Sequence, residues 1–197
     1  MTTTTVRAAA LVALVCACAP VSASAEFLVS PYFAWTRNKD TQRWRPGGGA
    51  TAEVHIGWLT AGGDVGYASS FFDPADDVLD LIASSYVLTA TGHAGIMYRP
   101  PDDDARILPY FTGGFGWMRQ QARDREGLVS VTRNDPSLHF GGGVNVMISE
   151  FLGARVDIRN FRSLRDPFET PDPIVEDLER VSFWRFTLGG VIRFGTD

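Results

Sequence analysis

The sequence predicts an all-β fold, an eight-stranded antiparallel up-and-down transmembrane β-barrel. Three observations carry this prediction. Eight segments alternate apolar and polar residues with a period of two, which is typical of strands with one apolar face. The connections between these segments are alternately short and long. Outside the N-terminus, no apolar run approaches the ~20 residues that a membrane-spanning helix needs.

The N-terminal residues 1–25 have the layout of a secretory signal peptide. Arg7 precedes an apolar stretch, and an Ala-x-Ala-like cleavage site ends at Ala25. The sequence therefore predicts a signal peptide over residues 1–25 and one barrel domain over residues 26–197. Because Val15–Cys18 resembles a lipobox, lipidation at Cys18 remains an alternative to simple cleavage.

The predicted mature chain is cysteine-free and acidic. Both cysteines, Cys16 and Cys18, lie within the signal peptide, which excludes disulfides and thiolate metal sites from the mature domain. Removal of Arg7 leaves 17 of the 18 basic residues against 23 acidic ones, a net charge of −6. This balance argues against a nucleic-acid partner, because proteins that bind nucleic acids usually present a basic face.

The first four strands are expected where apolar residues occupy every second position and Ser, Thr, Asp, Glu or His fill positions between them. A strand places these two sets on opposite faces. The segments, with their apolar positions, are Phe27–Arg37 (Phe27, Val29, Phe33, Trp35), Gly49–Gly57 (Ala52, Val54, Ile56), Thr60–Ser70 (Val65, Tyr67) and Ser84–Tyr98 (Tyr86, Leu88, Ala90, Ala94, Ile96, Tyr98).

The last four strands follow from the same pattern, with glycine and arginine prominent on the polar face. In the seventh segment, a helix would scatter the charges around its circumference, whereas a strand gathers them on one face. The segments, with their apolar positions, are Leu108–Met118 (Phe111, Phe115, Trp117), Ser137–Ile148 (Leu138, Phe140, Val144, Val146, Ile148), Leu152–Phe161 (Leu152, Ala154, Val156, Ile158) and Trp184–Phe194 (Trp184, Phe186, Leu188, Gly190, Ile192, Phe194).

The lengths of the connections predict the two ends of the barrel. Short turns are expected at residues 57–59, 100–102 and 149–151, and long polar loops at residues 38–48, 72–83, 121–135 and 162–180. Short periplasmic turns and longer external loops are typical of outer-membrane barrels. Within the second long loop, Asp73 and Pro74 suit the start of a short helix.

Alternation alone does not decide whether the polar face points outward or into the barrel, because a soluble lipocalin-like barrel would bury its apolar residues inside. Aromatic residues near the strand ends favour a membrane. Tyr86 and Tyr98 share a face and lie about 30 Å apart along the membrane normal, at ~3.3 Å per residue and ~40° tilt, which straddles an apolar band of ~25 Å. The predicted aromatic girdle comprises Trp35, Trp58, Tyr86, Tyr98, Trp117, Trp184 and Phe194.

The final strand, Phe183–Phe194, resembles the C-terminal strand of bacterial outer-membrane barrels. The pieces Pro109-Tyr110-Phe111, Gly113-Gly114-Phe115-Gly116 and Gly141-Gly142-Gly143 are similar to the family of eight-stranded outer-membrane β-barrel domains of the OmpA/OmpX type. The resemblance implies location in the bacterial outer membrane, with the lipid bilayer and the assembly machinery as partners. It implies no cofactor, and it leaves any ligand of the loops unknown. The chain departs from the family's terminal aromatic residue, because residues 195–197 follow Phe194.

If the apolar face meets lipid, the charged residues of the strands point into the lumen. Buried charges must be paired and hydrogen-bonded, so we expect one connected ion-pair network in which Glu53 and Asp64 face arginines. Its members are Glu53, Asp64, Arg155, Asp157, Arg159, Arg185 and Arg193. Such a network forms a rigid plug or, alternatively, lines a gated narrow pore.

The polar face also contains residues of the types that bind metals or act as nucleophiles. His55, His93 and His139 share the polar face, but they come from different strands, so we expect lumen histidines rather than a metal site. Ser137 lies two residues before His139, yet no acid is placed beside them and neither faces lipid, so we expect no catalytic residue. The expected role is non-catalytic: structural, surface-interacting or weakly permeating. A soluble periplasmic ligand-binding barrel and a lipid-modifying enzyme are the alternatives.

Overall fold

The computed structural model describes residues 25–38, 43–71, 82–100, 106–124, 130–164 and 181–195. These residues form eight strands, which are β1 (Ala25–Asn38), β2 (Trp44–Ile56), β3 (Leu59–Ser69), β4 (Ile82–Met97), β5 (Ile107–Asp124), β6 (Ser130–Met147), β7 (Leu152–Ser163) and β8 (Ser182–Phe194). Within these ranges, no helix is long and apolar enough to cross a membrane.

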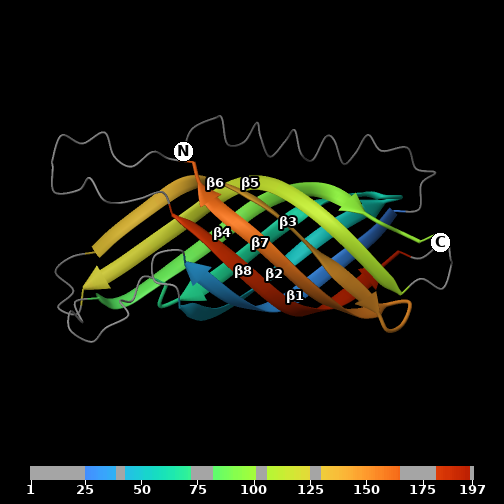
Figure 1. Cartoon of the computed structure of the whole chain (residues 1–197), viewed down its shortest axis with the longest axis horizontal. Coiled ribbons are helices and arrows are strands. Elements are labelled where there is room, and N and C mark those ends of the chain that lie inside the picture. Colours follow the sequence, from blue (N-terminus) through green and yellow to red (C-terminus); the bar gives the residue numbers. More distant parts are fainter. Residues whose placement is uncertain are drawn as a thin grey trace.

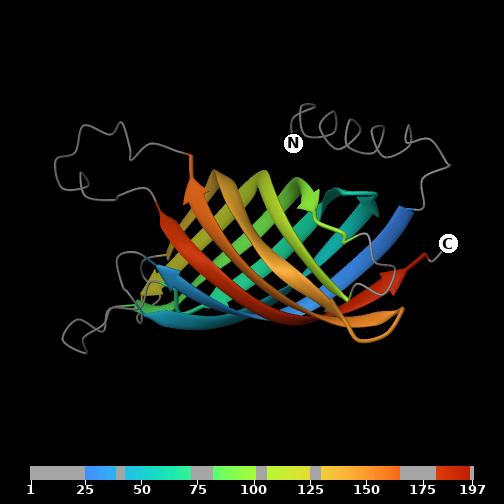
Figure 2. The same ribbon diagram turned by 45° about the vertical axis from the view of Figure 1, so that its right-hand side comes forward.

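The strands close into one barrel in chain order, and every neighbouring pair is antiparallel. β1 and β8 complete the closure, with Phe27 opposite Phe194 and Asn38 opposite Phe183. Figures 1 and 2 show that β1 begins and β8 ends at the same end of the barrel, which is also the end of the β2–β3 turn. The predicted eight-stranded up-and-down barrel is confirmed.

The outer wall is apolar and the interior holds the charges. Phe33 is 75% exposed and Phe111 is 55% exposed, whereas Glu53 and Arg159 are almost completely buried. This distribution is the reverse of what a soluble lipocalin-like barrel needs, since that fold keeps its apolar side chains inside. It matches a barrel whose outer face meets hydrocarbon.

Two of the four predicted long loops are wrong in extent, because strands occupy most of them. β2 begins at Trp44, which leaves residues 39–43 between β1 and β2. β5 continues to Asp124 and β6 starts at Ser130, so residues 125–129 alone separate them. The alternation of apolar residues stops where a strand leaves the apolar belt, although its backbone hydrogen bonds continue, and the sequence pattern therefore ended too early.

The β5–β6 hairpin extends past its neighbour at the loop end of the barrel. β5 and β6 pair as far as Arg123 and Ser130, whereas the pairing of β6 with β7 starts at Ser137. The hairpin reaches beyond β7 and β8 on the left of Figure 1. Apart from Ala25, which starts β1, the predicted signal peptide lies outside the described residues, as do Asp73 and Pro74 of the predicted helix.

Candidate functional site in the barrel lumen

Glu53 of β2 forms one centre of the polar cluster in the described lumen. Arg155 of β7 donates Nη1–H to Oε2 at 2.8 Å and Nη2–H to Oε1 at 2.9 Å, a two-bond pairing across the barrel. The ring Nε2 atoms of His55 and His93 lie 3.2 Å and 2.8 Å from the same carboxylate. All four side chains are buried. Glu53 therefore ties β2, β4 and β7 together.

Asp64 of β3 forms a second centre. Arg185 of β8 donates Nη2–H to Oδ1 at 2.7 Å, and the hydroxyls of Thr51 and Tyr32 each lie 3.0 Å from Oδ2 and donate to it. Asp64 is 1% exposed. Because both carboxylate oxygens have donors, burial of this charge is compensated.

Arg159 joins the two centres. Its Nε lies 3.0 Å from Oδ1 of Asp157, and its Nη atoms lie 3.9 Å from Glu53 and 3.8 Å from Asp64. Tyr110 adds a further link, since it donates to Asp157 at 2.5 Å and accepts from Nε of Arg155 at 2.6 Å. Three carboxylates and three guanidiniums thus form one continuous, charge-balanced cluster.

Aromatic rings and glycines shape the space around this cluster. Arg185 lies over the rings of Tyr32 and Phe161, with its Cζ 5.1 Å and 4.5 Å from their centroids. A Cβ added to Gly49 would lie 2.5 Å from Oη of Tyr32, and one added to Gly66 would lie 2.8 Å from it. These two positions therefore need glycine to make room for the Tyr32 ring.

Two apolar layers close the lumen on either side of the charges. The layer at the end of the short turns comprises Leu28, Met97, Leu108, Tyr110, Met147 and Val191. The layer at the loop end comprises Ala68, Phe71, Val87, Met118, Phe161 and Phe183, with Val181 packed against it. In that layer the rings of Phe161 and Phe183 stack at 5.0 Å. The predicted packed polar lumen is therefore not polar throughout, because an apolar layer lies on either side of the charges.

Arg193 does not reach the cluster, contrary to the expectation of one network with seven members. It lies at the turn end, where its Nη1 is 3.5 Å from Glu26 and its Nε donates to the carbonyl of Glu150 at 2.7 Å. Arg99 pairs with the same Glu26 at 2.6 Å. The reason is position: Arg193 is next to the last residue of β8, beyond the apolar layer that contains Val191.

The histidines and Ser137 take structural places in the lumen. His139 stacks on Phe161 at 5.0 Å and makes an edge contact with His93 at 6.0 Å, apart from the pair on Glu53. No group of three or more side chains of metal-ligand type is arranged around a common point in the described ranges. Ser137 and His139 are both buried, and within those ranges neither His139 nitrogen nor the Ser137 hydroxyl has a hydrogen-bond partner.

The residues of the predicted aromatic girdle fall at the two ends of the barrel wall. Those near the loop end are Trp35, Tyr86, Trp117 and Trp184, and those near the turn end are Trp58, Tyr98 and Phe194. All except Tyr86 are exposed on the outside; Tyr86 is half-buried, packs on Tyr67 and donates to Gln121 at 2.7 Å.

Asn145 is a buried lumen residue that does not belong to the predicted site. Its side chain is completely buried on the inner face of β6, and neither amide atom has a partner among the described residues. A sequence signal for Asn145 does exist. It is a polar residue on the inner face, whereas Met147, two residues later on the same face, and Val191 belong to the apolar turn-end layer. Buried polar atoms of this kind are commonly satisfied by internal water.

Comparison with known proteins places this geometry in a family. The model of the outer membrane protein beta-barrel domain family matches residues 8–191. Neisserial surface protein A has a similar fold, with a TM-score of 0.63 and 12% identity over 87% of this chain and 97% of that one. No curated protein is significantly similar in sequence.

Two further solved structures share the fold. Ail of Yersinia pestis, in complex with the heparin analogue sucrose octasulfate, has a TM-score of 0.55 and 18% identity over 87% of this chain and 99% of that one. A major outer membrane protein from Thermus thermophilus has a TM-score of 0.55 and 15% identity over 86% of this chain and 99% of that one. At these identities the likeness concerns the fold alone.

Proposed function

Because the chain belongs to the outer membrane protein beta-barrel domain family, and is thus a protein of the bacterial outer membrane, we propose that it acts through its outer and loop-end surfaces and not through its lumen. Its role in this proposal is non-catalytic, structural and surface-interacting. The lumen serves to hold the eight strands in register.

One observation carries this proposal, the closure of the lumen by three successive layers. One apolar layer lies on each side of the balanced cluster around Glu53 and Arg159, which fills the space between them. An eight-stranded barrel has an interior just wide enough to be filled by side chains. An ion would have to displace both apolar layers and pass paired charges of both signs, so the arrangement supports a plug over a narrow pore.

Planar-bilayer recording tests this choice. We expect purified wild-type barrel to give no conductance steps in concentrated potassium chloride, provided that heat-modifiable gel mobility shows it to be folded. Steady single-channel steps from folded protein would overturn the proposal in favour of the pore. The Phe161→Ala/Phe183→Ala variant, which empties the loop-end layer, is also expected to stay closed, since the charge cluster and the turn-end layer remain.

The environment of Ser137 and His139 supports a non-enzymatic role. Both side chains face the lumen, where His139 stacks on Phe161, away from any lipid substrate. An activated nucleophile needs a base within reach and a group that orients it. Mass spectrometry of lipid A from cells with and without the gene tests this part of the proposal. An altered acyl pattern would refute it.

We further propose that the assembly machinery recognises β8 in spite of the residues that follow Phe194. The apolar outward set of this strand, which ends at Phe194, resembles the terminal strand of outer-membrane barrels. We expect Phe194→Ala to lower the amount of folded barrel in the outer-membrane fraction, and deletion of residues 195–197 to leave it unchanged. The opposite pattern would contradict the proposal.

The β5–β6 hairpin is the part of the described loop end best placed to meet a surface partner. Its strands continue past the β6–β7 pairing and carry exposed polar residues such as Arg119 and Asn134. Ail, a neighbour in fold, is known in complex with a sulfated sugar. We propose a comparable surface role for this chain. Binding of cells that display the barrel to a sulfated polysaccharide, compared with cells displaying Arg119→Gln/Arg123→Gln, tests it.

A further inference from the structure

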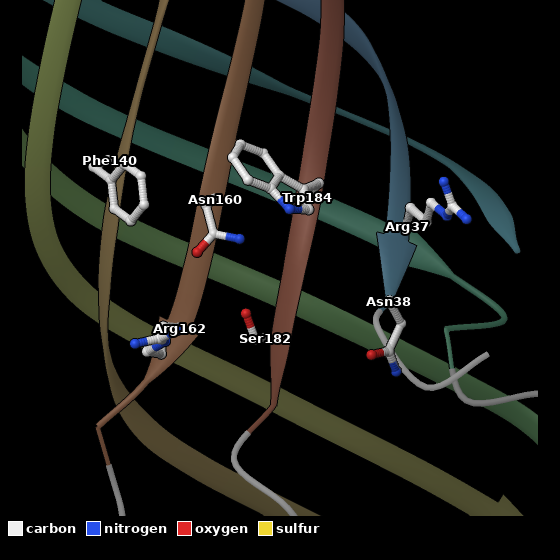
Figure 3. Close-up of a pocket in the computed structure, with 7 residues that line it drawn as sticks. All are labelled: Arg37, Asn38, Phe140, Asn160, Arg162, Ser182 and Trp184. Atoms are coloured by element: carbon white, nitrogen blue, oxygen red, sulfur yellow. The ribbon is translucent and has the colours of Figure 1, made fainter. Parts of the chain in front are cut away.

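A groove of about 490 Å³ lies on the outer wall at the loop end, across β6, β7, β8 and β1. Figure 3 shows Asn160 and Ser182 near its middle, with Arg162 on one side and Arg37 on the other. The plugged lumen and the β5–β6 hairpin make no use of this groove.

Strand register shows which face these side chains occupy. Asn160 of β7 and Arg37 of β1 lie opposite Trp184 of β8, on either side of it. Phe140 of β6 lies opposite Asn160. Directly opposed residues share a face, and Trp184 and Phe140 are exposed on the outer wall. Hence this row of four residues faces outward, toward the membrane.

The groove sits at the loop-end edge of the apolar belt. One step toward the membrane centre, the outward row is fully apolar, with Phe186 between Ile158 and Trp35. One step toward the loops, Arg162 lies opposite Ser182. The change from apolar to charged side chains within two rows is the position at which lipid headgroups meet a barrel.

Asn160 is polar, faces outward and yet is only 7% exposed. The rings of Phe140 and Trp184, which flank it, lie edge to face with centroids 6.4 Å apart. Its Nδ2 donates to the carbonyl of Phe183 at 3.4 Å. The Asn160 amide is therefore largely covered by the two rings, and its hydrogen bond goes to the backbone of β8.

The two arginines of the groove have no acidic partner within the described ranges. No carboxylate there pairs with Arg37 or Arg162, whereas every arginine of the central cluster has at least one. Arg37 lies 6.0 Å above the ring of Trp44, which restricts its guanidinium. Two strand spacings and two residues along the strand separate the Cα atoms of Arg37 and Arg162, about 12 Å in total.

We propose that this groove binds the phosphorylated headgroup of a lipid in the outer leaflet. Arg37 and Arg162 donate to phosphate oxygens at opposite sides of the headgroup, and the Ser182 hydroxyl lies between them. Planar guanidiniums bind phosphate oxygens with two parallel hydrogen bonds, which makes arginine suited to this ligand. The apolar rows below, with Phe186 and Ile158, then contact the acyl chains of the same molecule.

Native mass spectrometry of the folded barrel in detergent tests the proposal. The variants are Arg37→Gln/Arg162→Gln and the matched control Arg99→Gln/Arg106→Gln, which removes the same charge from exposed positions between β4 and β5 at the turn end, away from the groove. The probes are bisphosphorylated lipid A, dephosphorylated lipid A and inorganic phosphate. Heat-modifiable mobility establishes that each variant is folded.

We expect wild type and control to bind bisphosphorylated lipid A equally, and the Arg37/Arg162 variant to bind it at least about tenfold more weakly, as expected when charge-assisted bonds are lost. Wild type should show a similar loss with dephosphorylated lipid A. Equal binding by the groove variant, or by dephosphorylated lipid, would overturn the proposal. If inorganic phosphate at equal concentration displaces the lipid, the groove is a general anion site and the lipid assignment is wrong.

Discussion

Arg155 and Glu53, which are 102 residues apart in the chain, meet across the lumen through two parallel hydrogen bonds of 2.8 Å and 2.9 Å. The two residues lie on β7 and β2, strands that are not neighbours in the sheet. Their pairing therefore spans the barrel instead of reinforcing one strand pair, and both charges are buried.

Loss of Arg155 should be far more costly than loss of a charged residue at the rim. Arg155→Met leaves Glu53 buried without its main partner, so we expect the free energy of unfolding to fall by about 3–5 kcal/mol. Arg193→Met removes a partly exposed pair with Glu26 and should cost no more than about 1 kcal/mol. Urea titrations of both variants in detergent micelles, followed by tryptophan fluorescence, measure the difference. Equal losses would show that the cluster does not stabilise the barrel.

Two glycines should respond in opposite ways to the same substitution. Gly49→Ala places a Cβ 2.5 Å from the Tyr32 hydroxyl and closer still to the carbonyl of Val65, so we expect destabilisation of about 1–3 kcal/mol. A Cβ at Gly190, on the outer face of β8, meets nothing within 4 Å. Gly190→Ala should therefore be neutral or stabilising by up to about 1 kcal/mol. Urea midpoints that rank the two variants the other way round would refute the packing argument around Tyr32.

Single cysteines should reveal which end of the barrel faces outward. The predicted mature chain lacks cysteine, so Asn134→Cys on β6 and Glu150→Cys in the β6–β7 turn each provide one label site. We expect a membrane-impermeant maleimide to label Asn134→Cys on intact cells, and Glu150→Cys only after the outer membrane is permeabilised, because short turns face the periplasm. The reverse pattern would invert the orientation.

The N-terminus of the mature protein should be Glu26. Cleavage after Ala25 removes both cysteines, so the intact mass should correspond to residues 26–197 without lipid, and wild-type protein should not react with maleimide. A mass that begins at Cys18 and carries acyl chains would instead establish the lipoprotein alternative. The measurement needs only purified protein from the outer-membrane fraction.

The sequence was sufficient for the strands but not for the contacts across the lumen. The charged residues of Leu152–Phe161 occupy every second position of the strand, and the structure places Arg155, Asp157 and Arg159 together on the inner face. Which carboxylate meets which arginine depends on strand tilt and stagger around the whole barrel. Alternation in one strand carries no such information, and for the same reason it does not show that Arg193 lies outside the central cluster.

The apolar layers could have been predicted from residues that break the alternation. Four apolar residues occupy inward-pointing positions, which are otherwise mostly polar, close to strand ends: Leu28, Phe161, Phe183 and Val191. In a barrel whose outer face meets lipid, an apolar residue at an inward-pointing position has to pack against other apolar residues in the lumen. The extension of β5 to Asp124 offered no comparable signal, because both faces of a strand in water accept polar side chains.

Arg185, the partner of Asp64, is carried by β8, the last strand of the chain. If the barrel is open between β1 and β8 so that Arg185 does not reach Asp64, three carboxylates face two guanidiniums between the apolar layers. Closure of the barrel and neutralisation of the lumen charges are therefore coupled. The open barrel contains one uncompensated negative charge, and this electrostatic cost is removed when β8 pairs with β1.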